Sequence, residues 1–162
     1  MAENDLMTDR LLLSRAVELA HQHVKAGRGG PFGAIIVSNG RIIAEGRNEV
    51  TSGNDPTAHA EIVAIRGACQ SLGSFSLTGT SIYASCEPCP MCLAAIYWAR
   101  IDRMVFASTR EEAAAIGFDD AAIYQEIPKP LNQRSLPTLH LPLPEARDAF
   151  AAWVSSTSKI PY

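Results

Sequence analysis

The sequence lacks any apolar run long enough to cross a membrane, and its first residues do not follow the charged-then-apolar plan of a signal peptide. It also lacks a basic stretch. Its 14 Lys and Arg are outnumbered by 17 Asp and Glu, so that the formal net charge is −3. This balance does not favour a polyanionic partner such as a nucleic acid. Only four cysteines are present, and two or three of them cluster at metal-ligand spacing, which does not suggest a disulfide framework. We therefore expect a cytoplasmic protein with neither a membrane nor a nucleic-acid partner.

Internal repeats and low-complexity blocks are absent too, and the composition is that of a globular protein. Apolar residues make up 47% of the 162 residues and charged residues 19%. A chain of this length is sufficient for one domain with a full hydrophobic core. We expect a single domain over residues 1–154, followed by a short polar tail over residues 155–162 that ends in an aromatic residue.

The hydropathy pattern predicts strands that alternate with helices. A helix is expected over residues 8–26, and Asn39-Gly40 is a strong hairpin signal between two apolar strands. A hairpin followed by alternating helices and strands predicts a mixed five-stranded sheet with helices on both faces, an α/β three-layer α/β/α sandwich. The strands are expected at residues 33–38, 41–47, 80–85, 103–108 and 139–141. A second helix is expected directly after Asp55-Pro56-Thr57, with Asp or Thr as its N-cap. Three further helices are expected over residues 90–98, 110–116 and 144–154.

The chemistry-bearing motif is split into two parts, His59-Ala60-Glu61 and Pro88-Cys89-Pro90-Met91-Cys92. A lone C-x-x-C is weak, because redox pairs and structural zinc sites also contain it. H-x-E followed by P-C-x-x-C is the pattern of zinc-dependent nucleobase deaminases. His59, Cys89 and Cys92 would supply three zinc ligands and leave the fourth position to water, which is the arrangement of a catalytic site.

The motif also predicts which role the metal ion and each side chain have in the reaction. Zinc lowers the pKa of a bound water toward ~7, so that water becomes the nucleophile at neutral pH. Glu61 would move protons between the water, a ring nitrogen and the leaving amino group. Residues two apart point in different directions in mid-helix, so His59 and Glu61 must stand at a helix start. Cys86 is expected to be a small buried residue and not a fourth ligand, because a Cys₃His set would close the site to water.

Longer stretches around these residues extend the pattern. They are Gly29-Gly30-Pro31-Phe32-Gly33-Ala34, Asn54-Asp55-Pro56-Thr57-Ala58-His59-Ala60-Glu61, Ser85-Cys86-Glu87-Pro88-Cys89-Pro90-Met91-Cys92, Ala95-Ile96-Tyr97-Trp98-Ala99-Arg100, Gly117-Phe118-Asp119-Asp120 and Lys159-Ile160-Pro161-Tyr162. Together these stretches resemble the bacterial guanine deaminases of the cytidine-deaminase superfamily. The resemblance runs from about Leu11 to Tyr162, and the Gly-Phe-Asp-Asp phrase and terminal Tyr single out the guanine branch.

This resemblance implies a cytidine-deaminase-like fold, one Zn²⁺ per subunit and hydrolysis of guanine to xanthine and ammonia. It implies that Asn48 binds the mixed donor and acceptor edge of the base, and that Phe32 and Trp98 form aromatic walls. Asp120 would accept from guanine N–H groups and assist the departure of ammonia, as a catalytic and binding residue. Tyr162 would close the active site of the partner subunit in a domain-swapped homodimer.

Other interpretations stay open at this point. A nucleoside deaminase acting on guanosine or cytidine differs from a guanine deaminase by one pocket wall. A tRNA adenosine deaminase would need a basic surface for phosphate contacts, and a non-catalytic zinc-stabilised domain would not need Glu61. His21, His23 and His140 are expected to be surface or packing residues.

Overall fold

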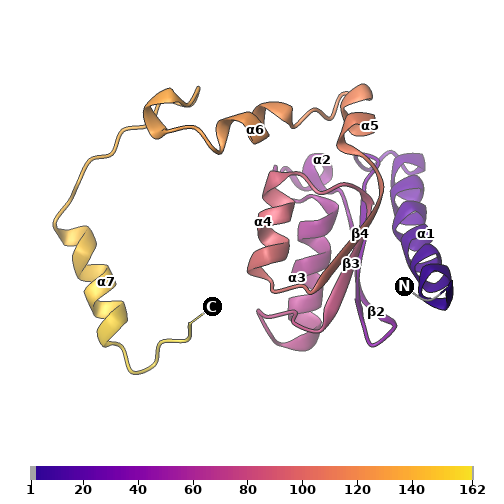
Figure 1. The fold of residues 1–162 in the computed structure, drawn as a ribbon, viewed down its shortest axis with the longest axis horizontal. Helices are drawn as coiled ribbons and strands as arrows, with labels where there is room; N and C mark the ends of the chain where they lie inside the picture. The colour runs from indigo at the N-terminus through magenta and orange to yellow at the C-terminus, as the bar shows by residue number, and fades with distance from the viewer. Residues whose placement is uncertain (1–2, 162) are drawn as a thin grey trace. The chain divides into compact units, whose positions relative to one another are not determined.

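The computed structural model describes residues 3–161. The chain divides into two compact units, residues 1–120 and residues 121–162 (Figure 1). This division falls earlier in the chain than residue 155, where the sequence pattern places the start of the tail. The two units differ in how their apolar side chains are buried.

A four-stranded mixed sheet forms the centre of residues 1–120. Its strands are β1 (Gly33–Ser38), β2 (Arg41–Arg47), β3 (Thr80–Cys86) and β4 (Arg103–Ser108), in the spatial order β2-β1-β3-β4. β1 is antiparallel to both β2 and β3, whereas β3 and β4 are parallel. The mixed sheet and the hairpin at Asn39-Gly40 are therefore as predicted.

Helices cover both faces of this sheet, which gives the predicted three layers (Figure 1). α1 (Glu3–Lys25) packs against β1 and β3 on one face, and α3 (Ala60–Leu72) packs against β2 and β1 on the other. α4 (Pro90–Trp98) lies beside α3. Two short helices, α2 (Val50–Gly53) and α5 (Arg110–Ala115), complete the unit.

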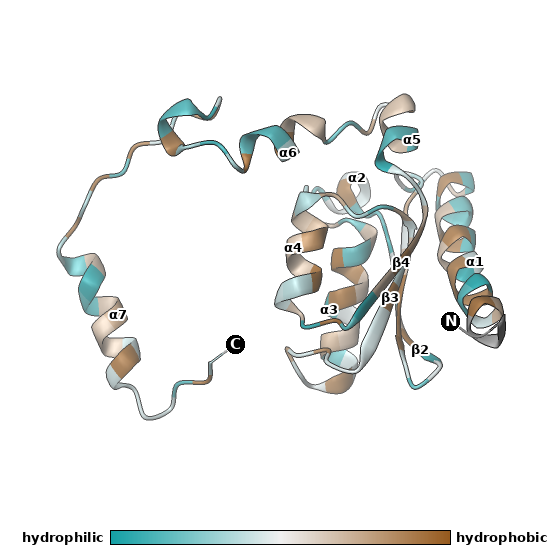
Figure 2. Cartoon of the chain, viewed as in Figure 1, coloured by the Kyte–Doolittle hydropathy of each residue, from teal (hydrophilic) through white to brown (hydrophobic). Residues whose placement is uncertain are grey.

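The core has two halves because successive side chains of a strand point to opposite faces of a sheet. Ile35 and Val37 of β1 pack with Leu19 of α1, whereas Ala34 and Ile36 belong to the cluster on the α3 side. Figure 2 shows strongly apolar residues along the strands and along α3. The continuous apolar run of β1 is thus explained by burial on both sides.

A glycine brings the start of α3 close to the sheet. A Cβ at Gly46 of β2 would lie 2.0 Å from the carbonyl oxygen of Ala60 and 2.6 Å from the backbone nitrogen of Ala64. No larger side chain fits there without a shift of backbone. Gly46 therefore allows the first turn of α3, which carries His59 and Glu61, to pack directly on β2.

The prediction that Asp55 or Thr57 is the N-cap of α3 is wrong. Asp55 accepts hydrogen bonds from the backbone N–H and the hydroxyl of Thr57, at 2.8 Å and 2.6 Å, and so closes a turn before the helix. The N-cap is His59, in an extended conformation without a side-chain capping bond. The short-range bond between Asp55 and Thr57 competes with capping, as Asp side chains commonly do in turns.

Residues 121–162 contain α6 (Ala121–Glu126), a 3₁₀ turn (Leu131–Gln133) and α7 (Glu145–Ser155). The fifth strand predicted near Leu139–Leu141 is wrong, because these residues adopt no regular structure. Pro137 and Pro142 flank the segment, and proline removes the N–H that a strand needs for its ladder. Among the described residues of this unit, none is buried.

No helix within the described residues combines the length and the apolar character needed to span a bilayer.

Candidate active site

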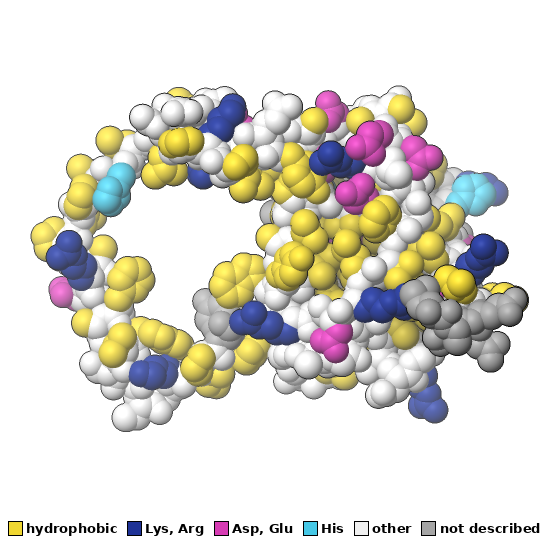
Figure 3. Space-filling view, in the orientation of Figure 1, with side chains coloured by type: hydrophobic (Ala, Val, Ile, Leu, Met, Phe, Trp, Pro, Cys, Tyr) yellow, Lys and Arg dark blue, Asp and Glu magenta, His cyan; other side chains and the backbone are white. Residues whose placement is uncertain are grey.

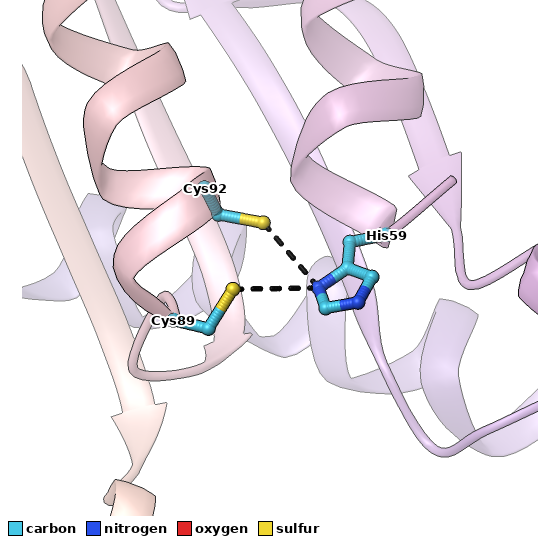
Figure 4. Close-up of side chains that lie close together, drawn as sticks. All are labelled: His59, Cys89 and Cys92. Carbon is cyan, nitrogen blue, oxygen red and sulfur yellow. Dashed lines mark hydrogen bonds between the residues drawn. The ribbon is translucent and has the colours of Figure 1, made fainter. Parts of the chain in front are cut away.

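The three predicted zinc ligands meet between two helix starts (Figure 4). His59 is the N-cap of α3 and Cys89 is the N-cap of α4, while Cys92 lies on the first turn of α4. His59 Nδ1 lies 3.5 Å from Cys89 Sγ and 3.5 Å from Cys92 Sγ. Within the part of the chain that the structure describes, these residues are the only cluster of His, Cys, Asp and Glu side chains suited to hold a metal ion.

The spacing of these donor atoms fits a zinc ion. Zinc binds thiolate sulfur at about 2.3 Å and imidazole nitrogen at about 2.0 Å, so a sulfur and a nitrogen at a tetrahedral angle lie about 3.5 Å apart. Both observed nitrogen–sulfur distances are 3.5 Å. Two soft sulfurs and one imidazole also form the donor set that zinc prefers. Three protein ligands leave one coordination position open for chemistry.

The surroundings favour thiolate at Cys89. Hydrogen bonds from Cys92 and His59 lower the pKa of Cys89 to about 4, although burial acts in the opposite direction. Cys92 shares a proton with Cys89 and is buried, so the pKa of its thiol is raised. The N-terminal ends of α3 and α4 add partial positive charge at this point. The pair thus holds one negative charge even before a metal neutralises it.

Glu61 lies on the first turn of α3, two residues after His59, and is 8% exposed. Burial is the largest cause of the raised pKa of this carboxyl, and the charge of Cys89 acts in the same direction. Because both residues stand at the start of α3, the side chains of His59 and Glu61 can point toward the same site, as the sequence motif requires. A buried carboxylate with a raised pKa is suited to accept a proton and release it again.

Cys86 stands apart from the ligand group. It is buried at the end of β3, and its thiol donates a hydrogen bond of 3.5 Å to the carbonyl oxygen of Thr109. Burial raises the pKa of Cys86 to about 11. A neutral thiol bound to a backbone carbonyl is a packing residue, in agreement with the prediction.

Asn48 is held between several segments directly after β2, and it is 6% exposed. Its backbone N–H donates to Phe32 O at 3.2 Å, and the next N–H, of Glu49, donates to Ala58 O at 2.8 Å. The side-chain oxygen accepts from Val50 N at 3.4 Å. Among the described residues the side-chain nitrogen of Asn48 has no hydrogen-bond partner, so its donors are available to a ligand.

An aromatic pair links the loop before β1 to the Gly-Phe-Asp-Asp phrase. The rings of Phe32 and Phe118 meet edge to face, with centroids 4.8 Å apart and an interplanar angle of 89°. The sequence pattern assigns no role to Phe118, although an aromatic residue directly before two acids was the available signal. This contact ties Phe32 to the segment that carries Asp120.

Asp120 lies close enough to the ligand group to be affected by its charge. Burial is the largest cause of the raised pKa of Asp120, and the charge of Cys89 follows. The structure thus brings Asp120 into the electrostatic neighbourhood of the three ligands. Its predicted contact with a substrate stays a prediction.

A further predicted site residue, Trp98, is not brought together with the ligands. Trp98 is the last residue of α4 and is 62% exposed. At 1.5 Å rise per residue it stands about 12 Å along the helix axis from the end that carries the ligands. Tyr162 lies outside the described residues. The assignment of these two residues as pocket walls stays a prediction.

Comparison with known proteins identifies the class of protein that this fold and site define. The family model of the cytidine and deoxycytidylate deaminase zinc-binding region matches residues 6–108. This range contains the three ligand residues and Glu61. The chain belongs to this family, and its cofactor is zinc.

Within the family, the chain is similar to guanine deaminases over most of its length. It is 52% identical to the guanine deaminase of Bacillus subtilis (strain 168) over 156 residues, which cover 96% of this chain and 100% of that protein. The solved structure of that enzyme superposes with a TM-score of 0.92 at 52% identity, covering 94% of this chain and 98% of the other. For guanine deaminase from Nitrosomonas europaea the TM-score is 0.65 at 32% identity, with 75% and 66% covered.

Similarity to another branch of the family is shorter. The tRNA-specific adenosine deaminase of Agrobacterium fabrum (strain C58) is 45% identical over 86 residues, which cover 53% of this chain and 57% of that protein. The part of the chain shared with the tRNA-specific enzyme is therefore about half.

Proposed function

We propose that this protein hydrolyses guanine to xanthine and ammonia. The observation that carries the proposal is the similarity to a guanine deaminase over 96% of this chain and the whole of that protein, whereas the tRNA-specific relatives align over 51% to 73% of the chain. The Gly-Phe-Asp-Asp phrase supports it, because Phe118 packs on Phe32 and Asp120 is affected by the charge of Cys89.

In this reaction a C2–O bond forms, the bond between C2 and the amino group breaks, and ammonia leaves. His59, Cys89 and Cys92 hold the zinc ion, which when bound supplies an activated water as the nucleophile. Glu61 takes a proton from the attacking water on its carboxylate oxygen. It passes protons to the N3 atom of the ring and to the leaving amino group, and this two-way role suits its buried carboxyl.

Recognition of the base falls to residues around the ligands. The Asn48 side-chain amide both donates and accepts, which matches the mixed edge of a purine. Phe32 offers a ring for stacking, and Asp120 accepts from guanine N–H groups and assists the departure of ammonia. Trp98, exposed at the far end of α4, would form a further aromatic wall.

The test is release of ammonia from a panel of amino-bearing bases. Purified zinc-loaded protein is incubated with guanine, guanosine, cytidine, adenine and a tRNA, and ammonia is measured. We expect guanine to have the highest kcat/KM. Faster turnover of cytidine or guanosine would assign the protein to the nucleoside deaminases, and turnover of the tRNA alone would assign it to the tRNA enzymes.

We also propose a cytoplasmic, domain-swapped homodimer in which residues 155–162 cross to the partner and Tyr162 closes its active site. The four cysteines are free, as expected of a reducing compartment. Apolar side chains of residues 121–161 are exposed within one chain, and exchange of an identical element is a low-cost route to a dimer. A closing segment excludes water and confines a small base.

Mixed dimers separate a swapped tail from one that closes its own site. One subunit carries Glu61→Gln and the other carries Tyr162→Ala, and the two are co-expressed and purified together. In a swapped mixed dimer, the site with intact Glu61 is closed by an intact Tyr162. Activity should return to about a quarter of wild type, because about half of random dimers are mixed and one of their two sites is intact. No recovery over either single variant would rule out the exchange.

A further inference from the structure

His23, which the sequence pattern predicts to be a surface or packing residue, is buried and contacts the backbone of Asn48. It lies near the end of α1, is 5% exposed, and its ring nitrogen Nε2 lies 2.7 Å from the carbonyl oxygen of Asn48. His21, two residues earlier on the same helix, is exposed. A buried polar ring is retained at little cost only when it is hydrogen-bonded, and this bond satisfies that condition.

The hydrogen bond from His23 means that both backbone polar groups of Asn48, the N–H and the carbonyl, have a hydrogen-bond partner. Its N–H donates to Phe32 O at 3.2 Å, and its carbonyl accepts from His23. Three segments far apart in the sequence therefore converge on this one residue: the end of α1, the loop before β1, and the end of β2. The side-chain amide is the part of Asn48 that this arrangement leaves to bind a ligand.

A glycine keeps this contact short. A Cβ at Gly29 would lie 2.4 Å from Asn48 O and 2.7 Å from His23 Nε2. Real Cβ atoms do not approach other atoms so closely, so any larger residue at position 29 must displace the carbonyl or the ring. The glycine, the histidine and the carbonyl oxygen thus form one packed unit.

We infer that His23 is a positioning residue for base recognition: its ring holds the Asn48 backbone so that the Asn48 amide faces the bound base. The inference rests on the proposed function, since it deepens the role of Asn48 in that site. His23 acts through Asn48 and does not itself touch the reacting atoms. A backbone carbonyl only accepts hydrogen bonds, so Nε2 of His23 must carry the proton.

The first measurement uses the wild-type protein and does not depend on activity. Long-range ¹H–¹⁵N correlation of the histidine side chains reports which ring nitrogen is protonated. We expect the Nε2–H form for His23 at neutral pH. The Nδ1–H form would overturn the inference, because its Nε2 has no proton to donate.

The second measurement is a set of kinetic constants for His23→Leu and His23→Gln. Leu removes the donor and leaves the Asn48 carbonyl buried without a partner, so kcat/KM for guanine should fall roughly 5- to 100-fold. The loss should lie mainly in KM, because base binding and not proton transfer is affected. Gln offers an N–H near the position of Nε2 and should restore most of the loss. His21→Leu, on the exposed side of α1, is the matched control and should match wild type.

A double-mutant cycle tests that His23 acts through Asn48. If it does, His23→Leu should cause no further loss once Asn48→Ala is present. Equal losses in both backgrounds would show that His23 acts on stability or on another part of the site, and would overturn the inference. Zinc content and thermal unfolding are measured for every variant, and a Leu variant that fails to fold leaves the Gln variant and the ring protonation to decide.

The test also separates this inference from the proposed substrate. If the wild-type protein releases ammonia from another base and not from guanine, the substrate proposal fails, and the cycle is repeated with that base. Non-additive losses on that base would still support the coupling of His23 to Asn48. An Nε2–H ring with additive losses would leave His23 a packing residue.

Discussion

Residues 1–120 and residues 121–161 both contain many apolar side chains, but only the first set encloses a core. Among the described residues, every buried apolar residue lies at or before Ala113, whereas the large apolar residues of the second set are exposed (Figure 3). These exposed residues are Ile123, Ile127, Leu131, Leu136, Leu139, Leu141, Leu143, Phe150, Trp153, Val154 and Ile160.

The difference shows where the chain's own packing is sufficient. The first unit buries both faces of its sheet and carries all the predicted site residues except Tyr162. In the second unit, Phe150, Trp153 and Val154 of α7 stand at helical spacing and are exposed. A large exposed apolar patch generally marks an interface. The contrast therefore supports the proposal that a second copy covers these residues.

The largest expected effect comes from removing a zinc ligand from the first unit. Cys89→Ala should abolish activity and lower bound zinc from about one ion per chain to nearly none, because the open site loses one of three protein ligands. Metal analysis by mass spectrometry measures it. Cys86→Ser is the matched control, and it should keep zinc since its thiol binds the Thr109 carbonyl. Loss of zinc in the control would make Cys86 a ligand.

Removing the proton acceptor should leave the metal in place. Glu61→Gln preserves the shape of the side chain and should lower kcat by roughly 10²- to 10⁴-fold, the scale of general acid–base catalysis. Zinc content and the unfolding temperature should stay near those of wild type. Glu111→Gln, an exposed residue of α5, serves as the control. Near-full turnover of the Glu61 variant would remove this residue from the mechanism.

Deleting residues 159–162 tests the contribution of the second unit directly. Guanine turnover should fall about 10- to 100-fold because an active site without its closing segment admits water and holds the base poorly. Zinc should stay bound, since all three ligands lie in residues 1–120. Tyr162→Phe keeps the ring and should retain more activity than the truncation. Full activity of the truncated protein would confine the whole function to the first unit.

The fold of the first unit could be predicted because its signals are local and agree with one another. The Asn39-Gly40 turn, the two-sided apolar strand at residues 33–38 and the helical periodicity of residues 8–26 each indicate their element independently. The second unit offers no such agreement. Leu139 and Leu141 alternate with other residues as a strand does, yet the neighbouring prolines and the lack of a pairing strand leave them irregular.

The metal ligands could also be predicted, because the spacing of His59, Cys89 and Cys92 reflects two helix starts that face one point. His23 and Phe118 could not, because their roles depend on contacts between distant segments. The His23 ring meets the Asn48 carbonyl 25 residues later, and Phe118 meets Phe32 across an even longer separation. A local signal, such as the aromatic residue directly before two acids at Phe118, can mark a residue but does not report which distant residue it contacts.

The smallest expected effect concerns an ion pair that ties α1 to the sheet of the first unit. Asp9 is 8% exposed and accepts hydrogen bonds from Arg103 Nη2 at 2.6 Å and from the Tyr83 hydroxyl at 2.8 Å. The bond from Arg103 is the main reason that the pKa of Asp9 falls to about 2. A folded-state pKa below the unfolded value of about 3.9 stabilises the protein above that pH. This contribution is lost as the pH falls from about 4 to about 2.

The lowered pKa of Asp9 corresponds to between about 2 and 3 kcal/mol at most, and because the Arg103 side chain is 43% exposed, screening by solvent reduces it to about 1 kcal/mol. We expect Asp9→Asn to lower the free energy of unfolding by about this amount at pH 6, and the difference from wild type to shrink toward pH 3. Urea unfolding of the two proteins across this range measures it, and effects of zinc release at low pH cancel in the difference. Asp148→Asn, on the exposed surface of α7, should leave the free energy unchanged. A difference that stays constant from pH 6 to pH 3 would show that the charge of Asp9 does not hold α1 on the sheet.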